Sequence, residues 1–243
     1  MAQISGEDPT TAPKTIIFVR HGESEYNKAI RDTGKDPFLR DAPLTAHGRM
    51  QAQEAQEKLR ELQEEVGGDG WLMLSSPLQR ALDTAAGLWP QCFAAGPLEI
   101  WPELREVVTG CDDLGSTPEK LLQKYPHLHQ LNHLPEIWWT VPKAYQDLPP
   151  DGDAMRDAYK NDPDAFEEAD EALFDSRVEL LISKLAALRE RKIVVVAHCD
   201  LIGSLTEKMG LKEKSEKKPG GFRKGWWLRN CECRMVRDFD FQR

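Results

Sequence analysis

The sequence predicts an α/β fold, a three-layer sandwich whose mostly parallel central sheet has helices on both faces and an inserted lid region. Short apolar runs alternate with longer segments of helical periodicity, which is typical of βαβ units with parallel strands. Two of these runs end at a histidine: residues 15–19 lead into Arg20-His21, and residues 193–197 lead into His198. Open α/β sheets bind ligands at the carboxyl edge of their strands, so we expect the functional site at that edge.

The strands of this sheet are expected where β-branched and large apolar residues cluster between turn signals. They cover residues 15–19, 71–75, 98–101 and 193–197, with one or two closing strands within 225–238. The intervening periodicity predicts helices from Leu44-Thr45 to about Val66, from Ser76-Pro77 onward, over 174–190 and over 201–209. Thr45 is the expected N-cap of the first of these helices, and proline is well placed in the first turn of the second.

The rest of the chain is less regular. Residues 107–172 are rich in Pro, Asp and Trp and have weak periodicity, so we interpret them as an inserted lid of loops and short helices. Residues 1–14 are polar and acidic, which predicts a frayed N-terminal tail, and residues 15–243 are expected to form a single domain. The basic run 212–224 is interpreted as a solvated loop, with steering of an anionic substrate as the alternative. The pairs Trp138-Trp139 and Trp226-Trp227 are interpreted as core anchors, with pocket lining as the alternative.

Composition excludes several classes of function. The 243 residues carry a net charge of −9, which argues against a nucleic-acid partner because such proteins need a basic face. No apolar run approaches the roughly 20 residues that span a bilayer. Five scattered cysteines favour reduced thiols in the cytoplasm over disulfides or zinc. His129 and His133 have i,i+4 spacing but lack the accompanying glutamate of a zinc helix, so we predict no metal site.

The residues that follow the strands suit a phosphate monoester. Its dianion is bound by arginine guanidinium groups, whose N–H donors form a fork. Its phosphorus is attacked by a nucleophile, and its leaving alkoxide takes a proton from an acid. Four consecutive strand ends supply such groups, namely Arg20 with His21, Arg80 one helical turn inside the next helix, Glu106, and His198. Because parallel strands end at one edge of the sheet, we expect these side chains to meet there.

With these residues in place, the chain resembles the histidine phosphatase superfamily, also called phosphoglycerate-mutase-like. The resemblance runs from about Thr15 to the end and is weakest between 112 and 172. It is carried by five motifs in order: Arg20-His21-Gly22-Glu23-Ser24 with Asn27, Leu44-Thr45-Ala46-His47-Gly48, Ser75-Ser76-Pro77-Leu78-Gln79-Arg80-Ala81 with Thr84, Leu104-Arg105-Glu106, and Val195-Val196-Ala197-His198. Cys199 and Asp200 depart from the pattern, since the superfamily often has glycine after the second histidine.

The resemblance implies a role for each matched position. His21 would be the nucleophile and become a phosphohistidine, and Glu106 would be the general acid, with Glu103, Asp112 and Asp113 as neighbouring carboxylates. The phosphoryl oxygens would be held by Arg20, Asn27, Arg80 and His198. No metal or cofactor is implied, because arginines and an imidazole supply the positive charge.

The favoured function is therefore a metal-independent phosphomonoesterase acting on a small phosphorylated substrate. The alternatives within the superfamily are a phosphoglycerate mutase and a sugar bisphosphatase, and the alternative of another class is a catalytically silent scaffold that binds a phosphorylated ligand. Mutases of the superfamily carry an Arg-Arg pair after the general acid. Between Glu106 and Pro150 this chain has only Lys120, Lys124 and Lys143, which favours hydrolysis. The sequence predicts neither the physiological substrate nor the oligomeric state.

Overall fold

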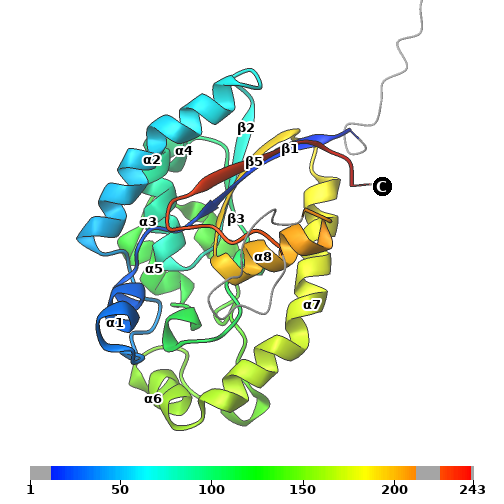
Figure 1. Cartoon of the computed structure of the whole chain (residues 1–243). Helices are drawn as coiled ribbons and strands as arrows, with labels where there is room; N and C mark the ends of the chain where they lie inside the picture. The colour runs from blue at the N-terminus through cyan, green and yellow to red at the C-terminus, as the bar shows by residue number, and fades with distance from the viewer. Residues whose placement is uncertain (1–11, 212–224, 242–243) are drawn as a thin grey trace, which may run out of the picture.

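A five-stranded sheet organises the protein, seen in a computed structural model that describes residues 12–211 and 225–241 (Figure 1). The strand order is β3-β2-β4-β1-β5, and every neighbouring pair is parallel except β1 with β5. The strands are β1 (Lys14–Arg20), β2 (Trp71–Ser75), β3 (Leu98–Ile100), β4 (Lys192–Ala197) and β5 (Cys233–Phe239). The predicted α/β fold with a mostly parallel sheet is confirmed.

Both faces of the sheet are covered, which explains the nearly continuous apolar runs of its central strands. In β1, Ile17 and Val19 belong to one core while Ile16 and Phe18 belong to the other. Figure 1 shows helices α2 (Ala46–Glu64) and α3 (Gln79–Leu88) on one side of the sheet and α7 (Pro163–Ala187) and α8 (Cys199–Lys208) on the other. The remaining helices are α1 (Glu25–Thr33), α4 (Pro90–Ala95), α5 (Pro118–Lys124) and α6 (Asp153–Asn161). Among these described helices, none has the length and apolar character needed to cross a membrane.

The start of α2 agrees with the prediction, whereas that of α3 does not. Thr45 caps α2, its side chain accepting a hydrogen bond from the Gly48 N–H. Helix α3 begins at Gln79 rather than at Ser76-Pro77, because Leu78 is extended and a buried aspartate accepts the Gln79 N–H. That aspartate, Asp41, lies 38 residues earlier in the chain, so local sequence does not reveal this cap.

Two further helices differ from the prediction. Helix α1 is not among the predicted helices, and none of its residues is buried. Its signal is the capping box of Ser24 and Asn27 together with the left-handed Gly34 that ends it. Helix α7 begins at residue 163 rather than 174, because a buried charged residue, Asp170, interrupts the apolar pattern of its first half.

The inserted segment 107–172 contains α5, α6, short 3₁₀ turns and the first turns of α7. Trp138 and Trp139 are buried within the core on the α2 and α3 side, as expected of core anchors. The action of this segment as a lid stays a prediction. The basic run 212–224 and most of the expected N-terminal tail, residues 1–11, lie outside the described residues, although Lys14 of that tail already belongs to β1.

Candidate active site

The carboxyl ends of the strands are level, and this brings the predicted site residues together. Beyond the last paired residues, the His21 N–H donates to the Ala197 carbonyl at 3.0 Å and the Ser76 N–H donates to the Val196 carbonyl at 3.1 Å. His198 follows directly on β4, the strand between β1 and β2. The two histidine rings consequently lie with their centroids 5.1 Å apart.

His21 is held as a neutral imidazole with one defined tautomer. Its Nδ1 lies 2.7 Å from the Gly22 carbonyl oxygen, which can only accept, so Nδ1 carries the proton and Nε2 keeps its lone pair. Burial lowers the pKa of His21 well below its usual value, and the nearby charges of Arg80 and Arg20 lower it further. A nucleophilic nitrogen is therefore available at neutral pH.

The backbone beside His21 makes an unusually close approach to helix α2. A Cβ at Gly22 would lie 2.6 Å from the Gly48 carbonyl oxygen, so only glycine fits there without a backbone shift. The Gly22 N–H donates to the Thr84 hydroxyl at 2.9 Å, and that hydroxyl donates to the Arg80 carbonyl at 2.7 Å. Thr84 thus ties the His21 turn to the start of α3.

The two predicted arginines differ in their surroundings. Arg20 donates from Nη1 to the Leu228 carbonyl at 3.0 Å, and its guanidinium lies 5.5 Å from the centre of the Trp227 ring. Arg80, only 2% exposed, forms ion pairs with Asp112 at 3.2 Å and Asp113 at 2.6 Å. Burial lowers the pKa of Arg80, but these two carboxylates outweigh it and raise the pKa, so the side chain stays charged.

His198 is fully buried and neutral. Its Nε2 lies 2.9 Å from the Ser76 hydroxyl oxygen. Burial lowers the pKa of His198 well below its usual value, with Arg80 and His21 adding to the effect. Three buried nitrogens in this cluster find no acceptor among the residues that the structure describes: Nε of Arg20, Nε of Arg80 and Nδ1 of His198. Buried polar groups are rarely unpaired, and a polar ligand at this place would give these nitrogens partners.

Glu106 lies at the N-terminal end of helix α8. Its Oε1 accepts from the Val107 N–H at 3.0 Å and the Leu201 N–H at 2.9 Å, and its Oε2 accepts from the Asp200 N–H at 2.9 Å. Burial raises the pKa of Glu106 to about 7, with the charges of Asp200 and Asp113 acting in the same direction. Glu106 is thereby able to hold a proton near neutral pH.

The sequence that builds this site also matches a known family. A model of the histidine phosphatase superfamily (branch 1) matches residues 16–172. The chain belongs to the histidine phosphatase superfamily. This is an enzyme family of phosphatases and mutases, as its matched relatives illustrate.

One relative is a 2,3-bisphosphoglycerate-dependent phosphoglycerate mutase of Bartonella henselae, 33% identical over 147 residues that make up 59% of this chain and 62% of the mutase. Another is a glucosyl-3-phosphoglycerate phosphatase of Mycolicibacterium vanbaalenii, 36% identical over 97 residues, 40% of this chain and 38% of that enzyme. The chain spans less than two thirds of the length of these curated relatives. The crystal structure of the ecdysone phosphate phosphatase from Bombix mori shares the fold, with a TM-score of 0.51 and 17% identity over 92% of this chain and 89% of that one.

The other predicted members of this histidine phosphatase site fall into two groups. Asn27 lies in the first turn of α1, where its Oδ1 accepts from the Ser24 N–H at 3.3 Å, so its amide NH₂ is the group left to donate to a phosphate. The alternative acids are engaged elsewhere: Glu103 pairs with Lys184 at 2.9 Å, and Asp112 and Asp113 pair with Arg80. Of these four carboxyl groups, Glu106 alone has no ion pair with a residue that the structure describes, and its role as the acid stays a prediction.

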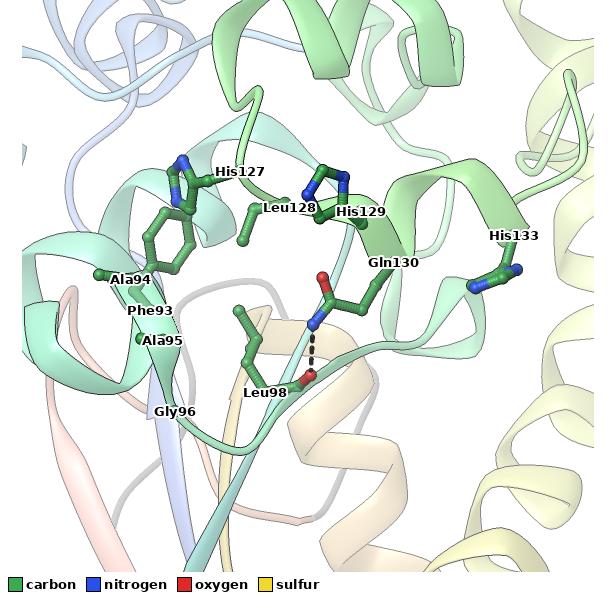
Figure 2. A pocket seen from close by; sticks show the side chains of 10 residues that line it. All are labelled: Phe93, Ala94, Ala95, Gly96, Leu98, His127, Leu128, His129, Gln130 and His133. Carbon is green, nitrogen blue, oxygen red and sulfur yellow. Dashed lines mark hydrogen bonds between the residues drawn. The ribbon is translucent and has the colours of Figure 1, made fainter.

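A separate hollow of about 330 Å³ lies at the opposite end of strand β3 (Figure 2). It is bordered by Leu98, the first residue of that strand, and by His127, His129 and His133. Figure 2 shows these three rings spread around the hollow rather than converging on one point. Within residues 12–211 and 225–241, no three His, Cys, Asp or Glu side chains gather as metal ligands would.

Sequence reasoning missed the partners of the site residues. Ser76 was noted only as part of a motif, yet its hydroxyl contacts His198. The sequence presents Asp112 and Asp113 only as carboxyl groups near Glu106, whereas in the structure both contact the Arg80 guanidinium. The only local signal for these two is their place between the third strand and a proline-rich segment, which does not specify a partner more than 30 residues away.

Proposed function

We propose that this chain is a metal-independent phosphomonoesterase that works through a phosphohistidine at His21. The observation that carries the proposal is the set of buried nitrogens of Arg20, Arg80 and His198, which lack a protein acceptor and surround a neutral imidazole. Donors of this kind suit the three non-bridging oxygens of a phosphoryl group, whose charge they stabilise during transfer.

In the first step, the His21 Nε2 lone pair attacks phosphorus in line with the departing oxygen. A P–N bond forms, the P–O bond breaks, and the leaving alkoxide takes a proton from Glu106. The resulting imidazolium keeps the proton on Nδ1, which donates a hydrogen bond to the Gly22 carbonyl. In the second step, the Glu106 carboxylate takes a proton from a water molecule, which attacks phosphorus, releases inorganic phosphate and restores the Nε2 lone pair.

The hydrogen bonds of Glu106 indicate where its proton resides. Oε1 already accepts two backbone N–H groups, which occupy both of its lone pairs, whereas Oε2 accepts only one. The free lone pair of Oε2 therefore carries the proton in the acid form. Oε2 is the atom that we expect to face the leaving group.

Hydrolysis is favoured over the mutase reaction by the cations after Glu106. A mutase must retain a phosphoglycerate by binding its carboxylate, for which the segment offers few free cations. Lys120 pairs with Asp151 at 3.0 Å, and Lys124 pairs with Asp83 at 2.9 Å. The silent-scaffold alternative is disfavoured because the nucleophile, the acid and the phosphate donors are all present in one cluster. We also propose small phosphorylated substrates and a cytoplasmic location, which the reduced state of the five cysteines supports.

The first test is steady-state hydrolysis of p-nitrophenyl phosphate in excess chelator, with phosphoglycerate interconversion measured in parallel. We expect phosphate release that chelator leaves unchanged, and no net mutase activity. Loss of hydrolysis in chelator with rescue by a divalent cation would contradict the metal-independent mechanism. Mutase turnover faster than hydrolysis would instead favour the alternative reaction.

A second prediction concerns Glu106→Gln. The glutamine cannot donate a proton, so hydrolysis of an alkyl phosphate such as glycerol phosphate should fall by about 10²–10⁴-fold. In kcat/KM, which reports only the steps up to the phosphohistidine, p-nitrophenyl phosphate should lose much less, because its leaving group departs without protonation. The value of kcat should fall for both substrates, because the glutamine also lacks the carboxylate that takes a proton from water in the second step.

The pH dependence of the wild type gives a further check on Glu106. Because its pKa is raised to about 7, the acid form is lost as pH rises through that value, and kcat/KM for an alkyl phosphate should decline there. Glu103→Gln, which changes a carboxylate of the same segment that pairs with Lys184, serves as the control and should leave the profile unchanged. An equal loss of kcat/KM on both substrates in Glu106→Gln would show that Glu106 is not the acid.

A further inference from the structure

Behind Glu106, a buried charge network fastens its segment to helix α7. Asp170 of α7 is completely buried, and its Oδ2 accepts from the Val108 N–H at 3.0 Å. The same carboxylate pairs with Arg105 at 3.3 Å and Arg177 at 3.2 Å, and it also accepts from the Thr140 hydroxyl. Two of the groups that donate to Asp170 therefore belong to this segment: the Arg105 guanidinium, one residue before Glu106, and the Val108 N–H, two residues after it.

The Arg177 side chain binds the main-chain carbonyls of the same segment. Its Nη2 donates to the Glu106 carbonyl at 3.2 Å, and its Nη1 donates to the carbonyls of Arg105 and Glu103. A single guanidinium therefore joins three carbonyls of the acid-bearing segment to Asp170. This segment lies outside the sheet, so its conformation is set by such contacts rather than by strand pairing.

The network is costly if its purpose is stability alone. It buries two arginines against one aspartate, and burial together with the neighbouring Arg105 charge lowers the pKa of Arg177 to about 10. Well-packed apolar residues often stabilise a core as well as or better than buried ion pairs do. An ion network additionally fixes the orientation of the groups that it joins, because each hydrogen bond sets an angle as well as a distance.

We infer that Asp170 and Arg177 form a clamp that positions Glu106 to protonate the leaving group. The inference rests on the proposed function, because it assigns these residues to the acid of that reaction. Neither residue touches the phosphate. Both act through the main chain of residues 105–108, whose placement sets where the Glu106 Oε2 lies relative to the leaving oxygen.

The test compares Arg177→Met with the wild type on two substrates of different leaving group. Methionine keeps much of the volume but removes the carbonyl contacts, so the acid is displaced. A displacement near 1 Å costs on the order of 10²-fold in rate, and we expect a loss of about this size in kcat/KM for glycerol phosphate. For p-nitrophenyl phosphate, which needs no proton, we expect a change of no more than about threefold.

Two further variants separate positioning from general stability. Arg177→Lys keeps the charge and part of the hydrogen bonding, so it should recover part of the glycerol phosphate activity. Asp170→Asn removes the clamp from the other side and should reproduce the same substrate selectivity if Arg177→Met fails to fold. Lys184→Met is the matched control: it removes another ion pair between α7 and this segment, the one to Glu103, and should leave both activities unchanged.

An equal loss on both substrates, or no loss on either, in folded Arg177→Met and Asp170→Asn would overturn the clamp while leaving the proposed function intact. Failure of the proposed function is recognised differently. In that case the wild type hydrolyses neither substrate, and the variants are not needed to see it.

Discussion

Replacing His21 with alanine is expected to abolish phosphate monoester hydrolysis, lowering kcat on the order of 10⁴-fold or more, because the variant has no atom on which the phosphoryl group can be carried. The loss should be the same for aryl and alkyl phosphates, since both pass through the same P–N bond. It should be accompanied by loss of covalent phosphate on the protein. A phosphohistidine is labile in acid and stable in base, which separates it from a phosphoserine.

The measurement is rapid quenching of enzyme with ³²P-labelled substrate at alkaline pH, followed by counting of protein-bound label. His129→Ala is the matched control, because it removes an imidazole that borders the separate hollow instead of the site. We expect label in the wild type and in the control and none in His21→Ala. Equal hydrolysis rates in all three proteins would remove His21 from the mechanism.

The strands and the residues at their ends could be predicted because the relevant signals are local. An apolar run that stops at a polar residue indicates both a buried strand and the position at which that strand ends. Since β1, β2 and β4 are parallel and in register, His21, Ser76 and His198 are brought to one edge. The same reasoning placed Arg80 close to that edge even though the start of α3 was predicted two residues too early.

What could not be predicted depends on partners far along the chain. Asp41 caps α3 from 38 residues away, and Asp170 holds residues near Glu106 from 62 residues away. In the sequence, Asp170 is one acidic residue among several in a polar stretch, and nothing there distinguishes a buried aspartate from an exposed one. Only the packing of α7 against the 3₁₀ turn Pro102–Leu104, which follows β3, brings Asp170 to this segment.

The pair Asp112 and Asp113 shows how strongly position determines the effect of a charge. Asp113 accepts from the Arg80 guanidinium at 2.6 Å and from the N–H groups of Thr109 and Gly110, at 2.9 Å and 3.1 Å. Burial raises the pKa of Asp113, and these donors oppose that rise by favouring its ionised form. For Asp112, burial raises the pKa well above its usual value, and the charge of Asp113 raises it further. One ionised and one protonated carboxyl group are therefore expected beside one arginine.

Asp113→Asn should lower the free energy of unfolding by about 3–5 kcal/mol, because it leaves the buried Arg80 charge without its ionised partner. It should also weaken hydrolysis, since Arg80 loses its orientation. Asp112→Asn replaces a neutral acid by a neutral amide and should change the free energy of unfolding by less than about 1.5 kcal/mol. Urea denaturation of both variants at several pH values makes the comparison.

The pH dependence has a definite sign. The native state keeps a proton on Asp112 that the unfolded state has already released, so the wild type loses stability as pH rises above the usual range of an aspartate. Asp112→Asn removes this loss, and its stability relative to the wild type should increase with pH until the native Asp112 itself ionises. Equal destabilisation by the two asparagine variants, independent of pH, would mean that the two carboxyl groups share the Arg80 charge evenly.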